Sequence, residues 1–390
     1  RVRDGILYKK PQGKDKTSYS ILTGTMDAGQ IENSKKQFET KPTSTLVQEG
    51  TIGESIELTA ALRLRCKLDY ACINDFEIVS KKAASLADSD DKRIYVVATF
   101  SKDSNESSAL SKKIKERFAE NPDSPVVYVD CGKTPLGSDS FSDWVENKAT
   151  ALYLQGKDNG QSTQYAQYAM KVLSQWKERI RNGQYVVYSQ NEPDGEFAGN
   201  ADALIASLSS INSKRFKLGL ECYNVIDNMW KSVGLKQGVG CGLTQKVEGT
   251  FRSSNTTTKL ETALNGAWLI DNYWESQPSL TISRIKINLD KYFDEIIEKN
   301  GRISIYEIYS YLKDAPFGFM PCNLSAFIIG FLLKEQILSE KYTWSDGTVS
   351  DDLSQERFKD MVERVIKNDI TPMPRYKDEY IVAMTEEEKS

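Results

Sequence analysis

Histidine is absent from the 390-residue sequence. A chain without imidazole has no histidine general base, no Ser-His or Cys-His nucleophile pair and no histidine metal ligand. Catalysis by carboxylate, lysine or tyrosine side chains remains open. The absence therefore excludes these kinds of site without excluding an enzyme.

Paired cysteines are missing as well. The chain has six scattered cysteines and no C-x-x-C pair. A zinc site made of cysteine alone needs such clustered pairs, so we expect neither a metal nor a bound cofactor. Scattered cysteines are typical of reduced thiols in a cytoplasmic protein. They are Cys66, Cys72, Cys131, Cys222, Cys241 and Cys322.

Long apolar runs and an excess of one charge are also lacking. The apolar stretch 327–333 falls far short of the ~18 residues that a membrane helix needs, so no membrane partner is expected. Charged residues make up 27% of the chain with a net charge of −4, which does not indicate a nucleic-acid scaffold or a disordered tail. The chain starts Arg-Val-Arg, with neither Met nor a signal peptide, and we expect a fragment of a larger protein.

Two apolar segments indicate a βαβ unit. Residues 93–100 (RIYVVATF) and 125–130 (PVVYVD) are typical of strands buried on both faces. Residues 106–119 between them carry apolar side chains at helical spacing. Such a unit implies parallel strands with a right-handed crossover. Ligands of open α/β sheets usually lie beyond the carboxyl ends of the strands, here residues 101–103 and 131–134.

The other elements of the first part follow from periodicity and turn residues. We predict an arm or loop over 1–16, strands over 19–23, 56–68 and 184–189, and loops over 191–199, 234–242 and 251–257. The predicted helices cover 27–38, 74–86, 143–153, 163–181, 200–211, 220–230 and 258–268, with Asp27 and Asn74 as caps. Together these residues predict an α/β domain over 1–278, made of one or two subdomains and built on a partly parallel sheet with flanking helices.

Residues 279–370 predict a winged-helix-like α+β domain, and residues 371–390 a tail with a terminal strand over 380–384. Within the domain we expect helices over 289–297, 305–312 and 353–366, and a short strand over 302–304. Asn323 can cap a further helix that runs to Lys334. The segments 342–344 and 348–349 flank Asp346-Gly347, a strong hairpin signal.

The helix over 323–334 would be the recognition helix of a DNA-binding winged helix, yet it is apolar nearly all round. Its one basic residue is Lys334, and residues 284–367 contain 12 basic and 14 acidic side chains. DNA affinity comes largely from basic side chains, and an apolar helix is normally buried. We therefore predict that protein covers this helix. The expected contacts to a partner are Phe317, Phe319, Phe327, Phe331 and Trp344.

Cys131-Gly132-Lys133-Thr134 follows a buried strand and invites comparison with a phosphate-binding P-loop. A P-loop also needs a glycine four residues before its Gly-Lys pair, and position 127 is a valine inside the strand. Lys133, Thr134 and the strand-end acid Asp130 are therefore weak nucleotide-site candidates. Gly238–Gly242 lacks the strand–turn–helix setting of a dinucleotide site and predicts a flexible loop.

One stretch is similar to a known family. Residues 305–309 (IYEIY), Leu312, residues 315–319 (APFGF), the apolar helix and residues 344–347 (WSDG) resemble a module of very large bacterial P-loop ATPases of the BREX phage-resistance type and related ATP-binding proteins. The likeness covers about a quarter of the chain. It implies a winged helix well C-terminal to the nucleotide site. The Gly-Lys motif of that site has no counterpart here, so the resemblance supplies no catalytic residue.

These observations favour a non-catalytic accessory or scaffold region of a large DNA-processing or phage-defence ATPase. Its partners would be other domains of the parent protein or separate proteins. The alternative is an autonomous nucleic-acid-binding winged-helix protein. An enzymatic form of that alternative would use carboxylates such as Asp103 and Asp130 with a metal at the strand ends.

Overall fold

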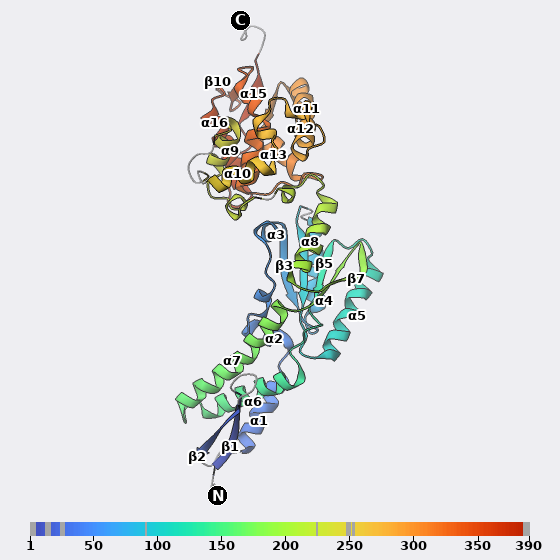
Figure 1. Cartoon of the computed structure of the whole chain (residues 1–390), viewed down its shortest axis with the longest axis vertical. Coiled ribbons are helices and arrows are strands. Elements are labelled where there is room, and N and C mark those ends of the chain that lie inside the picture. Colours follow the sequence, from blue (N-terminus) through green and yellow to red (C-terminus); the bar gives the residue numbers. More distant parts are fainter. Residues whose placement is uncertain are drawn as a thin grey trace.

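The computed structural model describes residues 5–11, 17–23, 28–89, 92–223, 225–246, 251 and 254–384, with side chains outside 5–11, 17–23, 28 and 254–258. The molecule is elongated, with an α/β unit in the middle and a largely helical C-terminal unit at one end (Figure 1). Among the described residues, no helix is both long and apolar enough to cross a membrane.

A five-stranded mixed sheet forms the centre of the α/β unit. Its strands lie in chain order, parallel from β3 to β5 and antiparallel from β5 to β7. The predicted parallel pairing of segments 93–100 and 125–130 is confirmed. The strands are β3 (Cys66–Ala71), β4 (Ile94–Thr99), β5 (Val126–Asp130), β6 (Tyr185–Ser189) and β7 (Glu192–Ala198).

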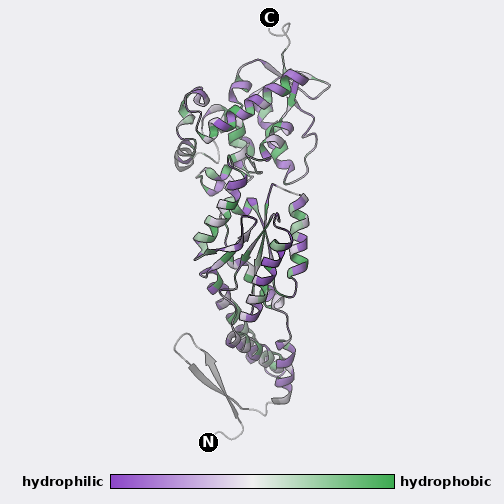
Figure 2. Ribbon diagram, turned by 90° about the vertical axis from the view of Figure 1, so that its right-hand side faces the viewer, coloured by the Kyte–Doolittle hydropathy of each residue, from purple (hydrophilic) through white to green (hydrophobic). Residues whose placement is uncertain are grey.

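Helices cover both faces of this sheet, which explains the continuous apolar strands. In β4, Tyr95 and Val97 belong to one buried cluster with α4 (Phe76–Ser89) and α5 (Ser104–Glu120). Val96 and Ala98 belong to the opposite cluster. That cluster includes side chains of α2 (Thr43–Glu49), α6 (Ser138–Leu154), α7 (Asn159–Arg181) and α8 (Ala201–Arg215). Along the helices, green and purple bands alternate, as amphipathic elements require (Figure 2).

The C-terminal unit has one continuous hydrophobic core that extends from Leu218 to Ile381, across the boundary predicted at residue 278. Its first helices are α9 (Leu235–Thr244), α10 (Ser254–Ala263), α11 (Tyr273–Ser276) and α12 (Thr281–Asn300). There follow β8 (Arg302–Ser304), α13 (Ile305–Lys313), α14 (Asn323–Leu332), α15 (Lys334–Leu338), β9 (Tyr342–Ser345), β10 (Ser350–Asp352), α16 (Gln355–Asn368) and β11 (Tyr380–Ala383).

A small antiparallel sheet in this unit has the order β10-β9-β11-β8. The predicted terminal strand is therefore an interior strand, paired with β8 on one side and β9 on the other. The hairpin at Asp346-Gly347 is confirmed, because β9 and β10 pair antiparallel on either side of it. In the turn, the Asp346 carboxylate accepts from the main-chain N–H groups of Thr348 and Val349 at 3.0 and 2.9 Å. A hydrogen bond from the Thr348 hydroxyl, assisted by these two main-chain bonds, lowers the pKa of Asp346.

The strand predicted over 56–68 is wrong for most of its length. Residues Ala60–Arg65 form helix α3, and the strand begins at Cys66. Thr59 caps the helix, since its Oγ1 accepts from the main-chain N–H of Leu62 at 3.3 Å. Leu62 and Arg65, three residues apart, share the buried face. The apolar–basic alternation here fitted a helix as well as a strand.

Two other segments are strands where the sequence predicted irregular structure. β1 (Gly5–Pro11) lies in the predicted arm and pairs with β2 (Thr17–Thr23), which contains the predicted strand over 19–23. β7 occupies the predicted loop 191–199 as the outer strand of a hairpin with β6. β7 is an edge strand, so one of its sides is unpaired. Its residues are mainly polar and exposed, and the sequence therefore shows no apolar run that would predict a strand.

The segment predicted as a helix over 220–230 forms two short 3₁₀ turns, η2 (Leu220–Cys222) and η3 (Asp227–Trp230). Apolar side chains three residues apart suit a 3₁₀ turn as well as an α-helix. The helix predicted over 258–268 corresponds to α10, which starts earlier, and to η5 (Ala267–Leu269). The predicted cap Asp27 lies outside the described residues.

Candidate functional site

Asp130, at the carboxyl end of β5, is buried and fully engaged by neighbouring groups. Its carboxylate accepts from Ser111 Oγ at 2.6 Å, from the main-chain N–H of Gly132 at 2.8 Å and from Thr99 Oγ1 at 3.3 Å. Burial raises the pKa of the Asp130 carboxyl, and these hydrogen bonds partly oppose that rise. The carboxylate thus ties β4, β5 and α5 together.

The loop after β5 is a closed turn. Its Thr134 N–H donates to the Cys131 carbonyl at 2.9 Å, and Trp176 Nε1 donates to the Thr134 carbonyl at 3.0 Å. A phosphate-binding loop offers such main-chain N–H groups to its ligand, whereas here Gly132 and Thr134 direct theirs into the protein. Lys133 is exposed beside them. Asp130, Lys133 and Thr134, the nucleotide-site candidates, are therefore neighbours at a turn. The Gly132 and Thr134 N–H groups of this turn already have acceptors inside the protein.

The other strand-end carboxylates also have structural partners. Asp103 caps α5 and accepts from the main-chain N–H groups of Asn105 and Glu106, both at 2.9 Å. Glu106 accepts from the Thr43 hydroxyl at 2.7 Å and from the Lys102 main-chain N–H at 3.0 Å. In the described part of the chain, no group of three or more cysteine and acidic side chains is arranged to hold a metal ion.

An open cleft lies beside this edge, at the carboxyl end of β3. It has a volume of about 510 Å³ and is lined by residues of α2, η1 (Ile52–Ser55) and β3, including Val47, Glu54 and Tyr70, and by Cys72 just after β3. Burial raises the pKa of the Cys72 thiol, so the thiolate is disfavoured. Sequence reasoning missed this cleft, because it assigned no element to residues 43–55, which form α2, η1 and one wall of the cleft, and predicted a strand over 56–68.

The apolar helix of the C-terminal unit, α14, is buried along its whole length, mainly against α9. The loop predicted over 234–242, including the flexible loop over Gly238–Gly242, is wrong, because Gly234 is the N-cap of α9 and the rest belongs to that helix. The two helices meet through glycines. A Cβ on Gly242 would lie 2.2 Å from the Phe327 carbonyl oxygen, and one on Gly330 would lie 2.4 Å from the Val239 carbonyl oxygen. Glycine is required at both positions because backbone meets backbone.

The aromatic side chains predicted to contact a partner are buried inside this chain instead. Phe327 and Phe331 stack on Trp268, with ring centroids 5.5 and 6.1 Å apart. Phe317 and Phe319 are buried in the same core. Trp344 is 9% exposed, and its Nε1 donates to Glu379 Oε1 at 3.1 Å. The chain itself supplies the protein that covers α14.

The start of α14 is fixed to the segment before α9. Asn323 is its first residue rather than its cap, and its side-chain amide donates to the carbonyls of Asn228 and Val233, both at 2.9 Å. At the other end, Lys334 is 6% exposed, with its ammonium 4.8 Å from the centroid of the Phe331 ring. The one basic residue expected on the recognition helix is therefore buried in the protein.

Arg65 forms the joint between the two units, and no sequence signal identified it. Its side chain is fully buried, its Nε donates to Glu221 Oε1 at 2.7 Å, and its Nη1 donates to the Lys92 carbonyl at 2.6 Å. Its Nη2 donates to the Gly318 carbonyl, and the guanidinium lies 4.2 Å from the centroid of the Phe216 ring. A planar guanidinium is suited to bridging several acceptors.

Glycine 318 permits this joint. Its φ is +60°, and a Cβ at this position would lie 2.4 Å from the Phe216 ring. Around Arg65, Lys92 Nζ pairs with Asp314 Oδ1 at 3.2 Å, again joining the two units. The structure therefore concentrates polar contacts at the joint. No protein-family model, curated protein or solved structure matches this chain.

Proposed function

We propose that the chain is a non-catalytic scaffold region of a large cytoplasmic P-loop ATPase that processes DNA or resists phage. Its role is to hold other domains or protein partners at a set geometry. The observation that carries the proposal is the buried Arg65, which bonds to both units at once. A rigid connection between the two hydrophobic cores suits a region that holds attached domains or partners at a fixed distance and orientation.

The arrangement of the candidate groups supports this proposal. Asp103 caps α5 and Asp130 ties neighbouring elements together, and the main-chain N–H groups of Cys131, Gly132 and Thr134 donate within the protein. Helix α14 has no exposed basic face for a DNA groove. The resemblance of residues 305–347 to a module of BREX-type ATPases supplies the parent class.

A nucleotide assay tests the non-catalytic part. The purified chain is expected to release no phosphate from ATP above a protein-free control. Lys133→Ala is expected to match the wild type. Lys133 is exposed, and the Gly132 and Thr134 N–H groups beside it donate to acceptors within the protein instead of facing a phosphate. Turnover that Lys133→Ala abolishes would contradict the proposal.

The complete reading frame tests the scaffold part. We expect it to encode a Gly-rich loop with Lys-Ser or Lys-Thr elsewhere in the polypeptide. Removal of the present region from that polypeptide should leave nucleotide affinity unchanged and alter assembly, as native mass spectrometry would show. An unchanged assembly state would count against the proposal.

A further inference from the structure

The joint between the units is rich in basic residues. We define the waist as residues 57–67, 92–93, 213–223, 225–231, 313–321 and Asp369, the segments that contain Arg65, the residues it contacts, the η3 turn packed on α3 and the lining of the neighbouring pocket. It contains ten basic and five acidic side chains, although the whole chain has a net charge of −4. The basic residues are Arg63, Arg65, Lys67, Lys92, Arg93, Lys214, Arg215, Lys217, Lys231 and Lys313. The acidic ones are Glu57, Glu221, Asp227, Asp314 and Asp369.

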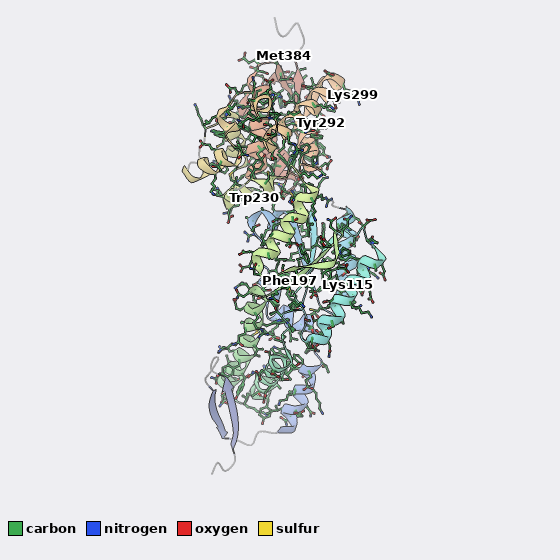
Figure 3. The ribbon with its side chains drawn as sticks, turned by 45° about the vertical axis from the view of Figure 1, so that its right-hand side comes forward. Lys115, Phe197, Trp230, Tyr292, Lys299 and Met384 are labelled. Atoms are coloured by element: carbon green, nitrogen blue, oxygen red, sulfur yellow. The ribbon has the colours of Figure 1, made fainter. Side chains whose placement is uncertain are left out.

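Contacts around Arg65 bring these segments together. Its guanidinium lies over Phe216, which is flanked in the chain by Arg215 and Lys217. Helix α3, which carries Arg63 as well as Arg65, packs against η3, which immediately precedes Lys231. Trp230, the last residue of η3, is labelled at the level of the joint in Figure 3. The basic side chains thus come from neighbouring elements of both units.

Several of these cations are exposed and free, whereas most of the acids are engaged. Within the described ranges, five waist cations form no ion pair: Arg63, Lys67, Lys214, Lys217 and Lys231. Among the acids, Glu221 binds Arg65, Asp314 binds Lys92 and Asp369 binds Lys313. Glu57 pairs with Arg181 of α7. The charge that the waist offers to a ligand is therefore mainly positive.

A small pocket lies in the waist and is shared by the two units. It has a volume of about 220 Å³, and its charged lining consists of Lys92, Arg93, Lys313 and Asp369. Pockets that enclose an organic ligand usually have ~300–1,000 Å³. A single phosphate group suits this smaller space, where it would compete with Asp314 for Lys92 and with Asp369 for Lys313.

We propose that the waist binds the sugar–phosphate backbone of a nucleic acid without sequence preference, with one phosphate in this pocket. The free cations lie on several elements instead of converging on one point, which matches a ligand whose charge repeats along its length. The wing and α14 have no part in this surface. The scaffold role does not require it, so either proposal can fail alone.

Fluorescence anisotropy with labelled single-stranded and duplex DNA tests this surface. The wild type should bind at about 50 mM salt and weaken steeply toward 200 mM as counterions are released. The triple variant Arg63→Glu, Lys217→Glu, Lys231→Glu should bind at least about tenfold more weakly. It should also lower the slope of log affinity against log salt by about two to three, as expected when roughly three phosphate contacts are lost.

A matched triple variant controls for net charge. Lys81→Glu, Lys115→Glu and Lys171→Glu change three exposed lysines of α4, α5 and α7 that form no ion pair in the described part of the chain. Lys115 lies on α5, away from the waist (Figure 3). This variant should retain wild-type affinity. Circular dichroism checks that each variant is folded, and glutamine versions of the waist variant should give a smaller loss.

Three results would overturn the proposal. The first is a wild type that shows no salt-dependent binding to either DNA. The second is an equal loss of affinity in the two triple variants, which would indicate diffuse charge and no defined surface. The third is binding of poly-glutamate as tight as that of DNA, because the waist would then recognise any polyanion.

Discussion

Asp130 and Arg65 are both ionisable side chains in the interior, and each is surrounded by polar partners. Asp130 accepts hydrogen bonds from two hydroxyls and a main-chain N–H, while Arg65 donates to one carboxylate and two carbonyls. Such satisfaction is the condition for burying a charge. For Asp130 the hydrogen bonds compensate only in part, because burial still raises the pKa of its carboxyl.

The raised pKa of Asp130 predicts a pH-dependent contribution to stability. The unfolded chain ionises this carboxyl at lower pH than the folded chain, so the folded protein binds more protons in the interval between the two pKa values. Stability should therefore fall as pH rises from the ordinary aspartate pKa through the folded one. Asp130→Asn keeps an acceptor oxygen and cannot ionise. Urea unfolding across this pH range should show a shallower decline for Asp130→Asn than for the wild type.

A second variant checks the cause of this effect. Ser111→Ala removes a hydrogen bond that lowers the pKa of Asp130, so its stability should decline more steeply with pH than that of the wild type. Equal slopes in the three proteins would show that Asp130 does not titrate differently on folding.

At the scale of helices and strands, the sequence predicted the elements whose apolar residues follow a clear pattern. Strands β4 and β5 were found because both of their faces are buried, which makes each a continuous apolar run. Helix α9 was missed because its glycines also signal a loop. Whether a glycine marks a turn or a close helix contact depends on the partner helix, and α14 lies far along the chain. The joint was missed for the same reason, because Arg65 bonds to Glu221 and Gly318, which lie far along the chain.

Alanine substitution at two glycines of α9 should change the free energy of unfolding in opposite directions. Gly242→Ala should lower the free energy of unfolding by at least about 1–3 kcal/mol, because its Cβ would meet backbone atoms of α14. Gly240→Ala should raise it by up to about 1 kcal/mol through helix propensity, since its Cβ would meet the flexible side chain of Lys359 at 3.3 Å. Urea titrations of both variants measure the difference. A stable Gly242→Ala variant would refute the close α9–α14 contact.

At the scale of the whole molecule, the net charge does not show how charged side chains are distributed over the surface. A net charge of −4 indicated no nucleic-acid surface, and residues 284–367 likewise contain more acids than bases. The waist combines residues from separate parts of the chain, so its basic excess appears when the fold brings them together. Chain averages therefore say little about a surface that several segments share.

Arg65→Ala tests whether the two units behave as one body. The variant leaves Glu221, the Lys92 carbonyl and the Gly318 carbonyl without their shared donor, and loss of one partner of a buried ion pair costs about 3–5 kcal/mol. We expect a lower thermal midpoint, separate unfolding of the two cores, and a broader distance distribution between spin labels placed on α5 and α16. Arg63→Ala is the matched control, because Arg63 is exposed on the same helix and forms no ion pair in the described part of the chain. Its unfolding and label distances should match those of the wild type. If Arg65→Ala also matched the wild type in both measurements, another contact would have to hold the units together, and the scaffold proposal would lose its main support.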